Sequence, residues 1–450
     1  MYRSVIGRRL LEIYNRERKR KLTAQEFFEK EIFEKFYNHK KYFKWVVNSP
    51  FVQKLSQKER KGTKTFEDEQ RRKLEKLYQK IEKDVPDSSF AIGFPSATET
   101  VDTSGQVSSM NVPMDKETIF LSWIGAGLGL EIEGGQVWYI DDEELLWTLY
   151  KGWEVYREQL DSKSIDLKAK EIDAWNAAWI EYKYNRKRIT PKFIIDSYVD
   201  KITTGKDRGK YAIRRVNWIS MVFRLAQIFP NRQITIFSAS YIFKKQKYNT
   251  IGFLVFMFPE VQRLFEFYPK IFAQSNVLKN KNLEAIYKAE MNFERASTLG
   301  VIGLRALEPS DLRKYMEDKK LKEDINEITI SNYKLWIIAM LNKEEILYLA
   351  KEAAQQLYNY FDRSEKGTRN KREQVVKEIL TSRRRESLFD ALNNLSDSDL
   401  QYALWVKRIS DNVMLNIAPD NIHLFVTLIK TEYNAIKAQS FSDNKYKETK

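Results

Sequence analysis

The sequence predicts an α+β protein that is mostly α: a mixed N-terminal domain with small antiparallel sheet elements and a basic β-hairpin, followed by a C-terminal helical bundle. Three observations predict this fold class. Apolar residues recur at helical spacing over most of the 450 residues. A Gly-, Ser- and Thr-rich region at 87–140 interrupts that spacing. Two β-branched and aromatic runs, Gln233–Phe243 and Thr250–Phe258, flank a short polar segment, as in a hairpin.

We expect a mixed domain over residues 1–330 and a helical bundle over 331–437, followed by a polar tail at 438–450. The parts of the first domain are, in order, basic helices at 1–86, the Gly-rich β region at 87–140, helices at 141–230, the hairpin at 233–258 and helices at 260–316.

Local signals refine these elements. Thr23 and Glu26 form a capping-box pattern at a helix start. Thr118–Trp123 and Gln136–Ile140 are predicted to be short strands. The acids at 141–144 fit the first turn of a helix, where the helix dipole stabilises negative charge.

Further helices are predicted within the two domains. Residues 65–83 have helical spacing and end near Pro86, 167–184 predict a Trp-rich helix, and 211–228 an amphipathic one. Within the bundle we expect loops near 366–371 and 393–399.

Composition excludes several kinds of chemistry. The chain has no Cys and only two His (His39, His423), so thiolate zinc sites, disulfides and a Cys nucleophile are excluded, and a Ser-His-Asp triad lacks its usual sequence signature. No run of about 18 apolar residues predicts a membrane span, and the N-terminus lacks a signal-peptide core. We therefore expect a cytoplasmic, non-enzymatic protein with no cofactor and no membrane partner.

The net charge of +15 is unevenly distributed. Residues 1–80 carry 23 Lys and Arg against 11 Asp and Glu, and residues 201–280 carry 14 against 3. The segment between them, 81–200, has 12 basic and 22 acidic residues. Two basic blocks of this size favour a polyphosphate backbone as partner.

The segment that joins the two hairpin runs is the first candidate nucleic-acid site. Lysines there can neutralise phosphates, while Tyr and Asn side chains can stack on bases or meet their edges. A charged turn that only solubilises the hairpin is the alternative. The candidate residues are Lys244, Lys245, Lys247, Tyr248 and Asn249.

Other candidates are basic pairs and polar loops. Arg214 and Arg215 precede Trp218, and a second basic stripe in the bundle runs through 369–372 and 383–385. Such runs are often only solvated faces. The remaining candidates are Arg383, Arg384 and Arg385 of that stripe, and Asn48, Ser49, Gln106 and Ser108 of two polar loops.

Other motifs favour structural roles. Gly125, Gly127 and Gly129 lack dinucleotide-loop spacing and are expected to allow close backbone approach or tight strand turns. Residues 204–207 (TGKD) do not form a P-loop. Trp175 and Trp179 share a helix face, which is more typical of a core.

Several segments of the chain together resemble a known family. These segments are Asn48–Gln53, Thr103–Val107, Ser122–Gly127, Gly152-Trp153 with Tyr156-Arg157, and Trp175-Asn176. On these motifs, over roughly residues 25–180, the chain resembles the large subunit of type I CRISPR Cascade complexes, and most closely the Cas-eight family of type I-B systems. Some relatives carry Cys-x-x-Cys pairs, which this chain lacks.

The resemblance implies a subunit that recognises the protospacer-adjacent motif in duplex target DNA and helps R-loop formation, while a guide RNA reads the sequence. It implies as partners the crRNA, the backbone, foot and small subunits, and a helicase-nuclease or transposition proteins. It also implies that the bundle after 331 resembles a small subunit.

Two alternatives remain open on the sequence alone. One is a metal-dependent nuclease that uses scattered carboxylates such as Glu181, which precedes Lys183 by two residues. The other is a general RNA-binding scaffold.

Overall fold

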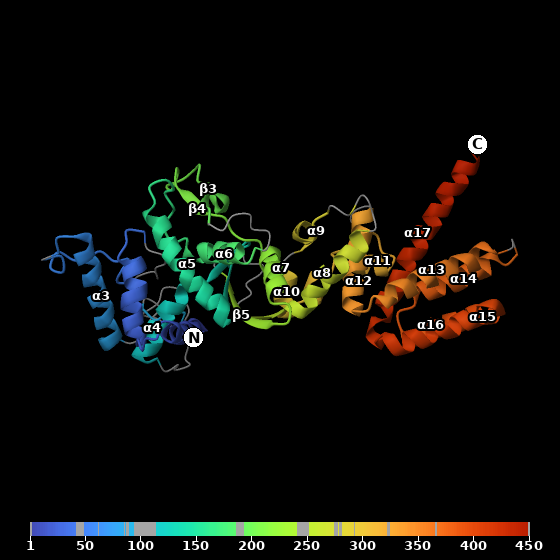
Figure 1. The fold of residues 1–450 in the computed structure, drawn as a ribbon, viewed down its shortest axis with the longest axis horizontal. Coiled ribbons are helices and arrows are strands. Elements are labelled where there is room, and N and C mark those ends of the chain that lie inside the picture. The colour runs from blue at the N-terminus through green and yellow to red at the C-terminus, as the bar shows by residue number, and fades with distance from the viewer. Residues whose placement is uncertain are drawn as a thin grey trace. The chain divides into compact units, whose positions relative to one another are not determined.

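The computed structural model divides the chain into two compact units (Figure 1). Unit 1 consists of Met1–Phe258 with Phe293–Ile302, and unit 2 of Pro259–Asn292 with Gly303–Lys450. The division therefore falls at Phe258, earlier than the boundary expected near 331. The structure describes residues 2–41, 49–61, 63–84, 86, 90–93, 114–185, 193–240, 252–273, 278, 281–291, 293–321, 325–364 and 367–448.

Unit 1 combines helices with all the described strands, as the predicted α+β class requires. Its helical elements are α1 (Tyr2–Glu17), α2 (Ala24–Phe27), the π-helix η1 (Phe28–Tyr37), α3 (Phe66–Lys83), α4 (Lys116–Ala126), α5 (Glu143–Asp161), α6 (Ile172–Lys183), the short 3-10 helix η2 (Ile195–Tyr198), α7 (Trp218–Ile228) and α10 (Phe293–Leu299). Its strands are β1 (Leu130–Ile132), β2 (Gln136–Ile140), β3 (Val199–Lys201), β4 (Tyr211–Ile213), β5 (Gln233–Ser240), β6 (Gly252–Met257) and β7 (Val301–Ile302).

A five-stranded sheet in the order β1-β2-β5-β6-β7 forms the centre of unit 1. Its pairs are antiparallel except β6 and β7, which are parallel. The predicted hairpin is confirmed as β5 and β6, with Gln233 opposite Met257. β2 is buried on both faces, because Trp138 packs on Phe293 of α10 while Tyr139 accepts a hydrogen bond from Arg3 of α1.

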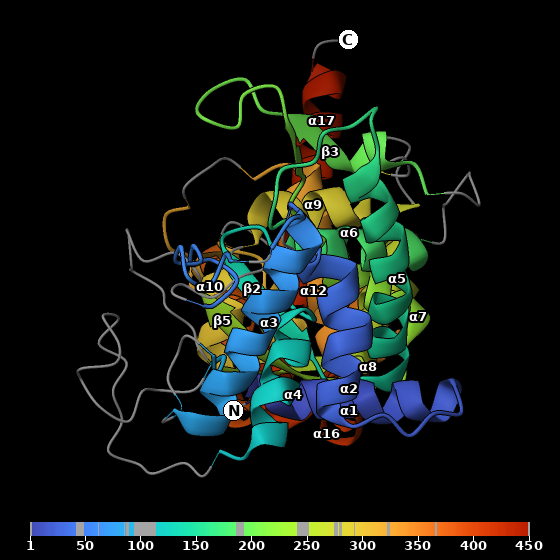
Figure 2. The ribbon, with the colours of Figure 1, turned by 90° about the vertical axis from the view of Figure 1, so that its left-hand side faces the viewer.

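Helices α1 and α4 cross at two glycines. A Cβ on Gly7 would lie 2.1 Å from the carbonyl oxygen of Leu121, and one on Gly125 would lie 1.8 Å from that of Arg3. Only glycine lets two helix backbones approach this closely. In Figure 2, α1 lies across the lower end of α5 and of the helix formed by α2 and η1. The prediction that Gly125 serves close backbone approach is confirmed.

Several predicted local features are confirmed. Thr23 and Glu26 form the capping box at the start of α2. Asp142 caps α5 by accepting a hydrogen bond from the Leu145 amide, and acids occupy the first turn. Trp175 and Trp179 are buried and stack with ring centroids 6.0 Å apart, so they belong to the core.

Three predicted elements are wrong. Residues 118–123 lie in helix α4, which begins at the N-cap Asp115, rather than in a strand. Residues 211–213 form strand β4, so the helix predicted from 211 begins only at Trp218. The loop predicted at 393–399 is largely the end of helix α15.

Unit 2 is helical in its described part. Its elements are α8 (Phe258–Phe272), α9 (Leu283–Glu290), η3 (Leu304–Leu307), α11 (Leu312–Met316), α12 (Glu327–Leu341), α13 (Glu345–Asp362), α14 (Arg369–Thr381), α15 (Arg385–Ser398), η4 (Leu400–Tyr402), α16 (Ala403–Asn416), η5 (Pro419–Asn421) and α17 (Ile422–Glu448). Helix α17 packs against α12, α13 and α14. Among the described residues, no helix is both long and apolar enough to cross a bilayer.

Candidate nucleic-acid interface

Most of the described residues that carry the family resemblance build the core of unit 1. The Trp175 indole donates to the carbonyl oxygen of Gly152 at 3.0 Å. The Asn176 amide donates to the carbonyl oxygens of Gly127 and Gly129 at 2.8 and 2.9 Å. These hydrogen bonds tie α6 to α5 and to the chain that follows α4, so the motifs have a structural role here.

The first polar loop is also buried where the structure describes it. Ser49 is 0 % exposed, and its hydroxyl has no hydrogen-bond partner in the described part of the chain. Phe51 stacks on Tyr37 with ring centroids 4.4 Å apart and lies edge-on to Trp123. The Ser49 side chain is therefore not on the surface, where a nucleic acid would meet it.

The remaining candidates from the hairpin tip and the polar loops lie outside the described residues. These are Lys244, Lys245, Lys247, Tyr248, Asn249, Asn48, Gln106 and Ser108.

The two arginines before Trp218, Arg214 and Arg215, both form ion pairs. Arg215 lies 2.9 Å from both Glu131 and Glu171, and the Glu171 side chain is only 2 % exposed. Burial lowers the pKa of Arg215, but the two carboxylates outweigh it and raise the pKa overall. Arg214 pairs with Asp200 at 3.1 Å. Arg215 thus balances a buried carboxylate, and a phosphate would have to displace Glu171 to reach it.

The three arginines at 383–385 differ in surroundings. Arg383 lies 3.6 Å from Glu317, and Arg385 donates to the carbonyl oxygen of Ile417 at 2.6 Å. Arg383 and Arg384 line an open groove of ≈ 470 Å³ between α14 and α15, but Glu378 and Asp390 line it too. The mixed charge makes this groove a weaker phosphate site than an unbalanced cluster of cations.

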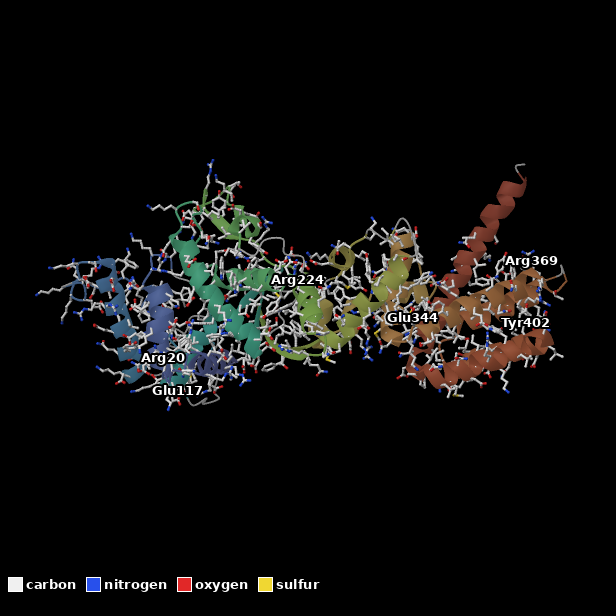
Figure 3. The ribbon with its side chains drawn as sticks, viewed as in Figure 1. Arg20, Glu117, Arg224, Glu344, Arg369 and Tyr402 are labelled. Atoms are coloured by element: carbon white, nitrogen blue, oxygen red, sulfur yellow. The ribbon has the colours of Figure 1, made fainter. Side chains whose placement is uncertain are left out.

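At the other end of the predicted basic stripe, residues 369–372, two arginines also contact neighbouring side chains. Arg372 pairs with Asp399 at 3.1 Å and lies over the Tyr360 ring. Arg369, labelled in Figure 3 at the start of α14, lies over the Phe361 ring with its Cζ 5.0 Å from the centroid. Both arginines therefore contact neighbouring side chains of the bundle, and Arg372 already has a carboxylate partner.

A stronger basic cluster lies at the β3–β4 hairpin. The strands pair from Val199 opposite Ile213 to Lys201 opposite Tyr211. On the far side of β4, the Lys168 amide donates to the carbonyl oxygen of Tyr211 at 2.8 Å. Gly205 and Gly209 have φ of 77° and 91°, which a tight turn with positive φ requires. The segment around Lys168 and the β3–β4 hairpin therefore lie side by side, and both carry lysines.

We call Lys168, Lys170, Lys206 and Lys210 the hairpin cluster. Burial lowers the pKa of Lys170, and the positive charges of Lys206 and Lys168 lower it further. Asp207 pairs with Lys210 at 2.8 Å, and Lys168 lies 3.6 Å from Glu171. Lys206 is exposed and makes no ion pair within the described ranges. The folded protein therefore holds several positive charges close together, and a bound anion would reduce the repulsion between them.

A second basic surface precedes α3. Its one acid, Glu59, turns away toward Lys76 at 2.9 Å. The hydrogen bond from Lys76, followed by those from Ser56, lowers the pKa of Glu59 to about 2. The cations of this turn make no ion pair in the described part of the chain, and all are exposed: Lys54, Lys58, Arg60, Lys61 and Lys64.

Sequence reasoning missed the hairpin cluster because it summed charge over long blocks. Lys168 and Lys170 fall within the acidic block 81–200, whereas Lys206 and Lys210 fall within the next basic one. The useful signal was the Gly-containing basic loop at 203–210, with two turn glycines and alternating cations.

Glu181, on which the nuclease alternative depends, lies on α6 and pairs with Arg224 at 3.0 Å. Both side chains are about one-fifth exposed, at 19 % and 20 %. Among the described residues, no group of three or more His, Asp or Glu side chains is arranged to hold a metal ion.

Comparisons with protein-family models, with curated proteins and with solved structures give no match for this chain. The resemblance to the Cas-eight family therefore remains an expectation drawn from the sequence motifs.

Proposed function

We propose that this protein is a non-catalytic nucleic-acid-binding subunit that holds phosphate backbones on the basic surfaces of unit 1. The hairpin cluster is the observation that carries this proposal. Its lysines repel one another in the folded state, and Lys206 makes no ion pair within the described ranges, although its positive charge helps to lower the pKa of the neighbouring Asp207. Phosphates bound there would release counterions and remove the repulsion, which makes binding favourable and dependent on salt.

More specifically, we propose the large subunit of a crRNA-guided CRISPR interference complex, which recognises the protospacer-adjacent motif in duplex DNA and helps open the R-loop. A helicase-nuclease or transposition proteins would then be recruited. The support is the motif resemblance in unit 1 and a helical unit 2 of the kind that the resemblance implies. Base pairing with the guide would supply sequence specificity, so backbone contacts suffice for most of the protein's surface.

The salt dependence of binding tests the first proposal. The affinity for a fluorescent 30-base-pair duplex is measured at several salt concentrations, for the wild type and for a triple variant, Lys168→Gln, Lys170→Gln and Lys206→Gln. Since each phosphate contact contributes about 0.9 to the slope, the variant should lose about two to three. The control carries the same charge change at three cations outside the hairpin cluster, each of which pairs with a carboxylate: Arg8→Gln, Arg72→Gln and Lys116→Gln.

Equal slopes for the triple variant and the wild type would remove the hairpin cluster from the interface. The subunit proposal has a separate test, which is to isolate the tagged chain from its native host and sequence the bound RNA. Short guide RNAs with other Cascade subunits support it. Bulk cellular RNA would favour the scaffold alternative.

A further inference from the structure

Trp147 on α5 lies in an unusual position for a Trp of this protein. It is partly exposed, and its indole N–H makes no hydrogen bond within the part of the chain that the structure describes. The other described Trp side chains are all buried, so Trp147 differs from them in its exposure. Four of them, Trp123, Trp175, Trp179 and Trp336, donate their N–H to a backbone carbonyl, whereas the N–H groups of Trp138, Trp153 and Trp405 make no hydrogen bond in the described part of the chain.

One face of the Trp147 ring packs on a buried aromatic side chain. It stacks on Tyr150 with centroids 5.2 Å apart and an interplanar angle of 14°. Tyr150 is itself 2 % exposed, packs edge-on against Tyr14, and donates its hydroxyl to Glu31 at 2.8 Å. A partly exposed aromatic ring fixed by a buried one loses little side-chain entropy when a further ring stacks on it.

Two cations lie over the same ring. The Cζ of Arg18 lies 5.8 Å from the centroid of the ring, and the Nζ of Lys151 lies 5.4 Å from it. Arg18 begins the turn between α1 and α2, which Asn15 closes by exchanging two hydrogen bonds of 2.9 Å with the backbone of Leu22.

The turn between α1 and α2 carries further cations beyond the Trp147 ring. Lys19, Arg20 and Lys21 follow Arg18 directly, are exposed, and make no ion pair within the described residues. Arg20 is labelled in Figure 3. A backbone that crosses this turn would meet several cations beside one aromatic face.

Charge alone would make this a weak site. Glu154 lies 3.9 Å from Arg18, and Glu143 pairs with Arg16, so part of the positive charge is already balanced. The distinguishing feature is therefore the partly exposed aromatic ring, which stacks on Tyr150 and has two cations over it. Only an unpaired base can offer its own face to it, because the bases of a duplex are already stacked on each other.

We propose that Trp147 is a stacking platform for an unpaired nucleobase of a single-stranded nucleic acid, whose adjacent phosphates lie against Arg18, Lys151 and the cations of the α1–α2 turn. This inference rests on the proposed function and specifies it, because it assigns a single strand to this face of unit 1. The ligand chemistry is a nucleobase on a sugar-phosphate chain, which either DNA or RNA supplies.

The test separates base stacking from backbone binding. Affinities are measured for a 15-nucleotide oligo-thymidine, for an abasic chain of the same length and charge, and for oligo-uridine. The wild type should bind oligo-thymidine about ten-fold more tightly than the abasic chain. Trp147→Leu should bring this ratio close to one without weakening abasic binding, and Trp147→Phe should keep most of it.

The control is Tyr348→Leu, an exposed aromatic of unit 2, which should leave the ratio unchanged. A wild type that binds both chains equally well overturns the stacking proposal and leaves nucleic-acid binding intact. A ratio that survives in a folded Trp147→Leu variant also overturns it. No binding of any chain, duplex included, overturns both proposals. If Trp147→Leu abolishes base preference only for oligo-uridine, the strand held there is RNA.

Discussion

Gly125 of α4 packs directly on the backbone of Arg3 of α1, so closely that a Cβ at position 125 would lie 1.8 Å from the Arg3 carbonyl oxygen. The Arg3 side chain extends from the same place to the hydroxyl of Tyr139 on β2, at 3.0 Å. Gly125 thus sets the spacing of α1 and α4, and the Arg3 side chain ties α1 to the central sheet.

Gly125→Ala should destabilise unit 1 strongly, because the new methyl group meets backbone atoms that cannot move aside. We expect a loss of about 3 kcal/mol or more, visible as a lower thermal midpoint. Gly252→Ala is the matched control, since a Cβ there would meet nothing within 4 Å. Equal midpoints for the two variants would show that the α1–α4 crossing is not as tight as described.

Glu31 should contribute stability that depends on pH. Burial raises its pKa, but hydrogen bonds from Lys35, Tyr150 and Tyr14 outweigh this, so the pKa lies below the usual 4.5. Its contribution is therefore complete above about pH 4.5 and is lost as the pH falls through the lower, folded-state pKa.

We expect Glu31→Gln to lower the thermal midpoint by about 4 °C at pH 7, and the difference from the wild type to shrink toward pH 3. Glu12→Gln, at an exposed side chain 3.9 Å from Arg9, is the control and should change little. A difference between wild type and Glu31→Gln that is constant with pH would contradict this account of Glu31.

Lys170→Gln should have different effects on the stability of the protein and on its affinity for duplex DNA. Since burial and the neighbouring lysines lower the pKa of Lys170, its charged form is less favourable in the folded state than in the unfolded one. Removing the charge should leave the thermal midpoint equal or higher, while duplex DNA binds more weakly. A lower midpoint with unchanged DNA affinity would instead assign Lys170 a structural role.

The nuclease alternative has a direct test. The purified chain, incubated with DNA and Mg²⁺ or Mn²⁺, should leave the DNA intact. If cleavage is seen and Glu181→Gln abolishes it without changing the thermal midpoint, the non-catalytic proposal is wrong. The Gln variant is preferable to Ala because Arg224, which pairs with Glu181, keeps a polar neighbour.

Sequence patterns predicted the fold class and the main hairpin because helical spacing and runs of β-branched and aromatic residues are local signals. Helix α4 was not predicted from these patterns, for a physical reason. All residues from Ile119 to Ala126 are buried, so the helix has no polar face and no visible periodicity. Its β-branched and aromatic residues then imitate a strand, and only the cap at Asp115 marks the helix start.

The candidate site was harder to predict than the fold. Arg215 and Lys206 are both basic residues near a turn, yet one balances buried Glu171 and the other is exposed. Which of them can meet a phosphate depends on contacts between segments far apart in sequence. Net charge indicates a phosphate-bearing partner, which stays a prediction, and only the tertiary structure separated cations that form ion pairs from those that do not.

Lysine reactivity tests the central proposal most directly. The chain is treated with an acetylating reagent, alone and with saturating duplex DNA, and each modified lysine is quantified by mass spectrometry. We predict that DNA protects Lys168, Lys170 and Lys206, while Lys288, which pairs with Glu284 in unit 2, reacts equally in both samples. Undiminished acetylation of all three hairpin lysines in a sample shown to be fully bound would contradict the proposal.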